Sequence, residues 1–156
     1  MRHGIPLSGA ETPDRERALS PEGAQEIVRA AAGLAAIGIR FDRIFTSPLA
    51  RAAQTAAIMA GSGVEPEETE ALAGGVVPEV LFQAIGRLPA DARILLVGHE
   101  PDMSGLAASL VGAPADHSIP FGRGSIARID VDGLPPRQGG RLVWLLTSRL
   151  AGELAG

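Results

Sequence analysis

Arg93-Ile94-Leu95-Leu96-Val97-Gly98-His99 is the stretch from which the fold of this 156-residue chain follows. Its apolar residues, 94–97, form a continuous run, as expected for a parallel strand that is buried on both faces. His99 stands at the carboxyl end of that strand, which is the edge where open α/β sheets bind ligands. The run therefore predicts an α/β fold with a polar site that begins at His99.

Helices are predicted before and after this strand. At residues 20–22, Ser-Pro-Glu is typical of a helix start, because serine caps, proline fits the first turn and a carboxylate suits the positive end. Residues 43–46 predict a short strand, and a second Ser-Pro pair, Ser47-Pro48, predicts a cap for a helix over 49–60. Further helices are predicted over 76–88 and 102–111. The residues expected on the buried faces of the first and third helices include Val28, Val77, Val80, Leu81 and Ile85.

Residues 125–131 and 141–146 predict two strands with no helix between them, so we expect an antiparallel hairpin at a sheet edge. The predicted fold class is α/β, with three layers (α/β/α) around a mostly parallel central sheet that ends in this C-terminal hairpin. We expect a single domain over residues 1–156 with no cap domain. The sequence predicts no element for the tail that begins at Arg149.

The net charge of −4 argues against a broad nucleic-acid surface, although it leaves room for a small cationic pocket. The chain has no cysteine, so disulfides and thiolate metal sites are excluded. Its histidines lack metal-ligand spacing such as His-x-x-x-His. No run approaches the roughly 18 apolar residues of a membrane helix, and no run of the signal-peptide kind begins the chain. We therefore expect a cytoplasmic monomer that uses no cofactor and binds neither nucleic acid nor membrane.

Arg51 falls in the first turn of the helix predicted over 49–60. A cation there opposes the helix dipole, which favours anions at that end. One interpretation is a solvated surface arginine, and the other is that an anion binds between Arg51 and the start of the helix. Gln54 and Thr55 lie three and four residues further on and are expected to share this face.

Three segments, in this order, resemble the histidine phosphatase superfamily (phosphoglycerate mutase-like), and most of all its short SixA-type phosphohistidine phosphatase branch. They are Arg2-His3-Gly4 (the RHG motif), residues 47–56 (SPLARAAQTA) and residues 97–101 (VGHEP). In that family an apolar strand precedes the Arg-His-Gly motif, whereas only Met1 precedes it here. We therefore expect the first strand to be largely missing from this chain and the native start to lie upstream.

The resemblance implies that His3 is the nucleophile that becomes phosphorylated and that Arg2 and Arg51 bind the phosphoryl group. It implies that His99 completes the pocket and stabilises the transferring group, and it makes Arg17 a further phosphate-binding candidate. A transferring phosphoryl group spreads negative charge over three oxygens, which two guanidinium groups and a protonated imidazole offset without a metal. A neutral imidazole is a competent nucleophile at pH 7, because its ordinary pKa is about 6.5.

Many members of the family use a carboxylic acid to protonate the leaving oxygen. Glu70 and Glu79 are the candidates for this general acid, although each taken alone is a solvent-facing carboxylate, and Glu100 is expected to point elsewhere. A missing acid matters less for phosphohistidine, because its leaving imidazole nitrogen can carry a proton that no carboxylic acid delivers.

The predicted function is that of a metal-independent phosphatase with a phosphohistidine enzyme intermediate, acting on phosphohistidine in a signalling or phosphotransfer protein. Only residues 61–93 separate the second helix from the strand before His99, so we expect a shallow pocket that admits a protein side chain. One alternative is a phosphomonoesterase for a small metabolite, which needs a working acid. Another is a non-catalytic phosphate-binding module, against which the presence of both histidines and both arginines argues.

Overall fold

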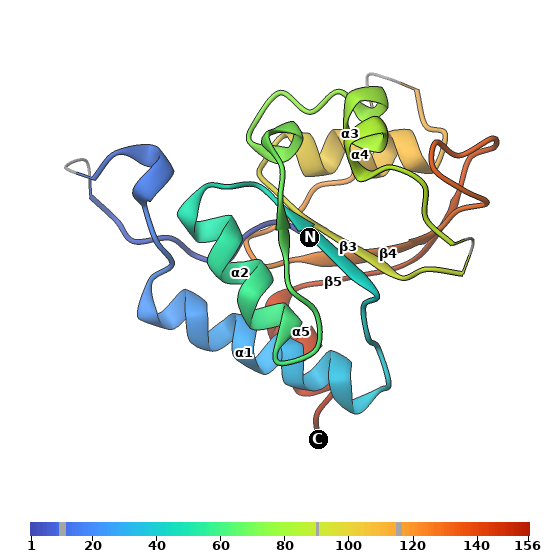
Figure 1. Ribbon diagram of the computed structural model, residues 1–156. Coiled ribbons are helices and arrows are strands. Elements are labelled where there is room, and N and C mark those ends of the chain that lie inside the picture. Colours follow the sequence, from blue (N-terminus) through green and yellow to red (C-terminus); the bar gives the residue numbers. More distant parts are fainter. Residues whose placement is uncertain (10–11, 90, 115–116) are drawn as a thin grey trace.

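The computed structural model describes residues 1–9, 12–89, 91–114 and 117–156. Within them the predicted α/β class is confirmed, with helices on both faces of a central β-layer (Figure 1). The helices are α1 (Pro21–Ala36), α2 (Ala50–Ala60), α3 (Pro78–Ile85), α4 (Asp102–Leu110) and α5 (Ser148–Glu153), with short 3-10 helices η1 (Asp14–Glu16) and η2 (Glu70–Leu72). The strands are β1 (Arg43–Thr46), β2 (Glu67–Glu68), β3 (Ile94–Val97), β4 (Ile126–Asp130) and β5 (Arg141–Leu146).

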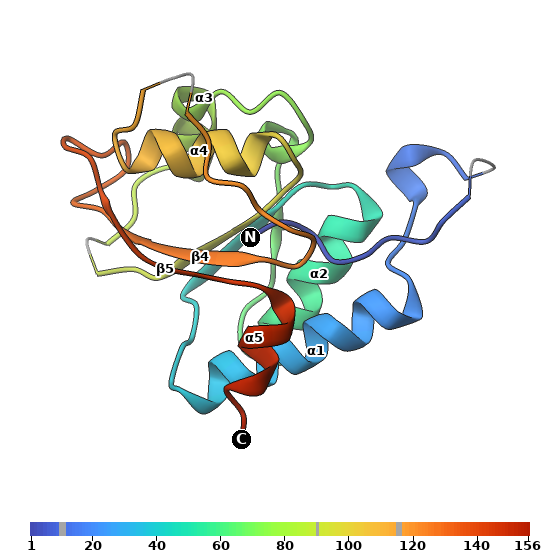
Figure 2. The same ribbon diagram turned by 180° about the vertical axis from the view of Figure 1, so that it is seen from behind.

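The helices form two layers around the strands. One face carries α1, α2 and α5, and the other carries α3 and α4, as the two opposite views show (Figures 1 and 2). The first layer shares a core that includes Ile27, Leu34 and Ile44. The second packs residues such as Leu81 around Phe45. Ile44 and Phe45 are neighbours on β1, so the alternation of side chains along this strand supplies one residue to each core.

Strands β2, β1 and β3 form a parallel sheet, in which Phe45 pairs with Glu67 on one side and Leu96 on the other. Strands β4 and β5 form the predicted antiparallel hairpin. Thr46 pairs with Val97 at the ends of β1 and β3. Because the two strands run parallel, the residues that follow them meet at the same edge of the sheet.

Residues 1–3 join the two sheets. The His3 N–H donates to the Gly98 carbonyl at 3.0 Å, and the Gly98 N–H donates to the Met1 carbonyl at 3.1 Å. On the other side, the Arg2 N–H donates to the Ser125 carbonyl at 3.0 Å. This segment therefore carries His3 to the edge where β3 ends.

The predicted buried faces are wrong at three valines. Val28 is 54% exposed, and Val77 and Val80 are 51% and 53% exposed. The face of α1 that packs against the rest of the protein contains small residues instead, and one of them, Gly33, lies against residues near the end of the chain. A Cβ at Gly33 would come within 1.8 Å of the Ala151 carbonyl oxygen. That end of the chain, for which the sequence predicts no element, forms α5 and packs closely on α1.

Candidate active site

The strand ends and the start of α2 bring three of the predicted site residues together. His3 follows the segment that pairs with β3, His99 follows β3 itself, and Arg51 is the second residue of α2. All three are buried, with exposed fractions of 6%, 8% and 7%. The two imidazole centroids lie 5.0 Å apart, and Arg51 Nε donates to His3 Nε2 at 3.3 Å.

The tautomer of His3 follows from a backbone neighbour. His3 Nδ1 lies 2.7 Å from the Gly4 carbonyl oxygen, which only accepts, so Nδ1 carries the ring proton. Nε2 is left with a lone pair that accepts from Arg51. Burial is the main cause that lowers the pKa of His3 to about 4; His99, Arg51 and Arg2 lower it further and the Gly4 carbonyl opposes them. His3 is therefore neutral at pH 7, with its lone pair on Nε2.

Thr55 ties α2 to the backbone beside His3. Its hydroxyl accepts from the Gly4 N–H at 3.1 Å and donates to the Arg51 carbonyl at 2.7 Å. A Cβ at Gly4 would come within 2.9 Å of Ile27 Cγ1. Glycine at residue 4 therefore allows the backbone after His3 to lie close against Ile27 of α1, while Thr55 holds it to α2.

His99 is held by Ser47, which follows β1. His99 Nε2 lies 2.8 Å from Ser47 Oγ, and this oxygen also accepts from the Leu49 N–H at 3.2 Å. Helix α2 begins only at Ala50, so the prediction that Ser47 caps it is wrong, and the serine anchors the imidazole instead. His99 Nδ1 is buried and has no hydrogen-bond partner among the described residues, which leaves it available to a ligand.

The sequence alone leaves open whether His99 is protonated before an anion binds. Burial and then Arg51 lower its pKa to about 4, with a smaller effect of Arg2, while Asp14 and Asp102 oppose them. His99 is therefore neutral at pH 7 in this structure. A phosphoryl group bound here would add negative charge and raise this pKa, because an opposite charge nearby favours the protonated imidazole.

Arg2 and Arg17 each have a buried donor without a partner in the described structure. Arg2 Nη1 donates to the Phe121 carbonyl at 2.9 Å, and Arg17 forms an ion pair with Asp14. The Nε atom of each arginine is buried and lacks a partner within residues 1–9, 12–89, 91–114 and 117–156. Because buried N–H groups are almost always paired, both donors are suited to bind the oxygens of an anion.

Asp14, which the sequence analysis misses, binds two of the candidate arginines. Its Oδ2 accepts from Arg51 Nη2 at 3.0 Å, its backbone oxygen accepts from Arg51 Nη1 at 2.7 Å, and Oδ1 pairs with Arg17. The hydrogen bond from Arg51 is the main cause that holds the pKa of Asp14 below its ordinary value, and Arg17 adds to it. Asp14 lies in a loop without a periodic pattern. The feature of the sequence that could have identified it is its position three residues before Arg17.

In the described part of the chain, neither predicted acid is hydrogen-bonded to this cluster. Glu70 lies in η2 and pairs with Arg15 at 2.7 Å, and its side chain is 70% exposed. Glu79 is exposed in the first turn of α3. Glu100 accepts a hydrogen bond from the Ser104 hydroxyl on α4. The carboxyl group that does contact the cluster belongs to Asp14.

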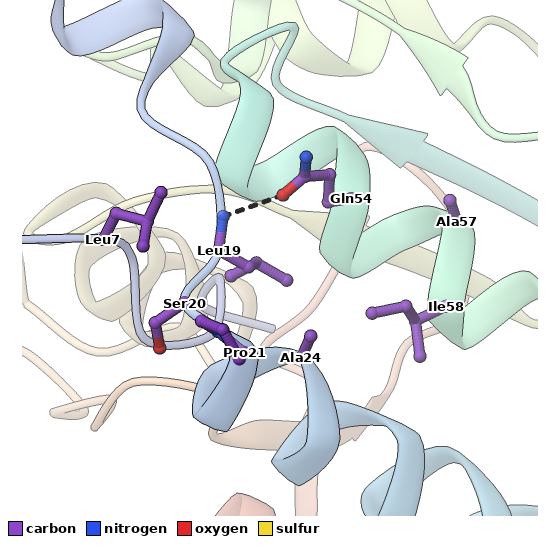
Figure 3. A pocket seen from close by; sticks show the side chains of 8 residues that line it. All are labelled: Leu7, Leu19, Ser20, Pro21, Ala24, Gln54, Ala57 and Ile58. Atoms are coloured by element: carbon purple, nitrogen blue, oxygen red, sulfur yellow. Dashed lines mark hydrogen bonds between the residues drawn. The ribbon is translucent and has the colours of Figure 1, made fainter. Parts of the chain in front are cut away.

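A groove of about 520 Å³ lies between α1, α2 and the loop before α1 (Figure 3). In it, Gln54 Oε1 accepts from the Leu19 N–H at 2.7 Å. The Thr55 hydroxyl is likewise engaged by backbone groups, and the expectation that Gln54 and Thr55 share an anion-binding face with Arg51 stays a prediction. The described residues that line the groove include no ionisable side chain and none of the imidazole and arginine cluster. The lining residues are Leu7, Leu19, Ser20, Pro21, Ala24, Gln54, Ala57 and Ile58.

The polar side chains of the cluster are arginines, imidazoles, one serine and one carboxylate. Among the residues that the structure describes, no group of three or more His, Asp or Glu side chains is arranged to hold a metal ion. No helix of the described chain is long and apolar enough to cross a membrane. Guanidinium forks around a neutral imidazole suit a phosphate-like anion.

Comparison with known proteins agrees with this geometry. Residues 1–74 match the model of the histidine phosphatase superfamily (branch 1). An uncharacterized protein of Picosynechococcus sp. is 32% identical over 124 residues, which are 76% of this chain and 75% of that protein. The structure of the protein histidine phosphatase SixA complexed with tungstate superposes with a TM-score of 0.77 at 25% identity, covering 96% of both chains.

Two further structures share the fold. A putative phosphohistidine phosphatase SixA from Nakamurella multipartitia has a TM-score of 0.76 at 24% identity, over 94% of this chain and 92% of that one. A phosphoserine phosphatase from Entamoeba histolytica has a TM-score of 0.68 at 17% identity, over 94% of both. With the family model and the SixA structure in agreement, the chain belongs to the histidine phosphatase superfamily.

Proposed function

We propose that this protein is a metal-independent phosphatase that carries the phosphoryl group on His3 and takes it from phosphohistidine in a signalling or phosphotransfer protein. Membership of the superfamily supports phosphatase activity. The observation that carries the proposal is the state of His3, which is buried and neutral and directs its Nε2 lone pair at Arg51. Such a nitrogen can attack phosphorus while the guanidinium binds the phosphoryl oxygens.

In the first step, His3 Nε2 attacks phosphorus and the bond from phosphorus to the substrate's imidazole nitrogen breaks. The proton on His3 Nδ1 stays in its hydrogen bond to the Gly4 carbonyl. Arg2, Arg17 and Arg51 donate to the three outer oxygens, where negative charge gathers in the transition state. In the second step water attacks phosphorus, the bond from phosphorus to His3 Nε2 breaks, and phosphate leaves, so that His3 regains its lone pair on Nε2.

His99 and Ser47 complete this arrangement. If the Ser47 hydroxyl donates to His99 Nε2, the ring proton lies on Nδ1, which is the atom without a partner in the described structure. Nδ1 then donates to a phosphoryl oxygen. The negative charge of that oxygen also raises the pKa of His99 from its low value, so that the imidazole gains a proton as the anion binds.

Two features support a protein-borne phosphohistidine over a small phosphoester. The outer part of the cluster is accessible, since the side chains of Arg17 and Asp14 are 33% and 59% exposed. The likeness to SixA, described as a protein histidine phosphatase, points the same way.

The test measures phosphate release, in the presence of a chelator, from three compounds. They are a phosphotransfer domain phosphorylated on histidine, phosphoserine and p-nitrophenyl phosphate. We expect the highest kcat/KM on phosphohistidine and no turnover by His3→Ala, which also fails to form an acid-labile phosphoenzyme. Arg149→Ala is the control, because Arg149 is 86% exposed on α5 and pairs with Glu153.

The outcomes separate the alternatives. Turnover of phosphoserine in clear preference to phosphohistidine would replace the substrate proposed here by a small metabolite. Tight phosphate binding without turnover would indicate a non-catalytic module. Full activity of a folded His3→Ala variant would show that His3 is not the nucleophile.

A further inference from the structure

We propose that Asp14 is the general acid and base of this site, which protonates the leaving group and later takes a proton from the attacking water. The inference rests on the proposed phosphatase function and identifies a residue that sets which leaving groups the site can expel. It is carried by the position of the carboxyl group relative to His3 and Arg51.

Asp14 and His3 lie along the same guanidinium group. Arg51 Nε donates to His3 Nε2 at 3.3 Å, and the adjacent Nη2 donates to Asp14 Oδ2 at 3.0 Å. A phosphoryl group bound by Arg51 and attacked by His3 is therefore within reach of the Asp14 carboxyl. The side chain is 59% exposed, so a leaving group that is in contact with solvent can reach it.

The other carboxyl groups near this edge are engaged elsewhere. Glu70 pairs with Arg15, and Glu100 accepts from Ser104 on α4. Asp102 accepts from the N–H groups of Gly75 at 3.0 Å and Val76 at 3.1 Å. Among the described residues, Asp14 is the carboxylate for which a contact with a site arginine is found.

The arginines that hold Asp14 also control its protonation. Arg51 on α2 and Arg17 on the same loop face the carboxyl group, and His99 lies close enough to interact with it. Both arginines keep Asp14 ionised in the structure described here. When a phosphoryl dianion binds these guanidinium groups, it compensates their charge and adds negative charge beside the carboxylate, which raises its pKa and favours the acid form.

The proton balance is then complete. In the first step the bond from His3 Nε2 to phosphorus forms, the bond from phosphorus to the leaving oxygen breaks, and the proton of Asp14 passes to that oxygen. In the second step water attacks phosphorus, the bond to His3 breaks, and the carboxylate of Asp14 takes the proton that water loses. No proton or electron is left over.

The experiment compares Asp14→Asn with the wild type on phosphoserine, whose alkoxide leaving group needs a proton, and on p-nitrophenyl phosphate, whose leaving group does not. Glu16→Gln, an exposed change in the same 3-10 helix, is the control. We expect kcat/KM on phosphoserine to fall by about 100-fold in Asp14→Asn, as for loss of a general acid. The ratio of the two kcat/KM values should shift by at least about tenfold towards p-nitrophenyl phosphate.

A pH profile gives a second, independent readout. For the wild type, kcat on phosphoserine should fall as rising pH removes the proton of Asp14 in the bound complex. Asp14→Asn should lose this alkaline limb, and Asp14→Glu should restore it. Thermal unfolding of each variant shows whether a loss of activity comes only from misfolding.

Equal losses on both substrates would overturn the proposal, because they would leave Asp14 with only the task of positioning Arg51 and Arg17. Faster turnover of both by Asp14→Asn would also overturn it, since the carboxylate would then merely compete with phosphate for the arginines. A different result would refute the proposed function, namely full activity of His3→Ala on every substrate.

Discussion

Removing the Ser47 hydroxyl tests whether this residue anchors His99 or is only part of a turn. Ser47→Ala deletes the contact of 2.8 Å with His99 Nε2 and the bond of 3.2 Å from the Leu49 N–H. Both Ser47 and His99 are buried, so water cannot easily replace the hydroxyl. Nε2 of His99 then loses its partner, and Nδ1 already lacks one among the residues that the structure describes.

The expected cost follows from these two contacts. Leaving a buried polar group without a partner costs about 1–3 kcal/mol in the free energy of unfolding, and we expect Ser47→Ala to lose an amount in this range. The hydroxyl also sets which nitrogen of His99 carries the proton. By analogy with hydrogen bonds that orient metal-bound histidines, we expect kcat/KM to fall by about 10- to 100-fold on every substrate.

Urea unfolding measures the first quantity, and initial rates on p-nitrophenyl phosphate measure the second. Ser62→Ala, at an exposed serine after α2, is the matched control and should change neither. A Ser47→Ala variant with the stability and rate of the control would refute the reasoning, because the hydroxyl would then neither pair His99 nor orient it.

Two further predictions concern stability. His3 and His99 have folded pKa values of about 4, below the ordinary 6.5, so protonation favours the unfolded chain; their contribution is present above pH 6.5 and is lost as pH falls towards 4. Urea unfolding across this window should show a smaller loss for His3→Gln and His99→Gln than for the wild type, and equal slopes would contradict the assigned burial effect. Gly33→Ala should destabilise by at least about 2 kcal/mol, because its Cβ would lie 1.8 Å from the Ala151 carbonyl oxygen. The control is Gly105→Ala in α4, where a Cβ meets nothing within 4 Å; it should stabilise the protein by about 0.5–1 kcal/mol. Similar effects of the two substitutions on stability would show that α1 and α5 are not so closely packed.

Most of the fold prediction rests on short-range patterns in the sequence. The apolar run before His99 forms β3, and Ser20 caps α1 through the Gly23 N–H at 3.0 Å. The same kind of pattern misled at Ser47, because a Ser-Pro pair after a strand resembles a helix cap whether or not the serine faces the helix. It also misplaced Val28, since a helix of small and apolar residues offers more than one face that satisfies the same period.

By itself, the sequence determined the α/β layers, the strand that ends at His99, and the place of Arg51 in the first turn of α2. These depend on neighbours along the chain, where apolar runs, caps and helix starts act over a few residues. Only the tertiary structure decided which groups meet. Asp14 lies 37 residues from Arg51, and Ser47 lies 52 residues from His99, so each contact depends on how parallel strand ends and a loop converge in space. The protonation of the imidazoles was decided there too, because it follows from burial and from the cations that folding gathers around them.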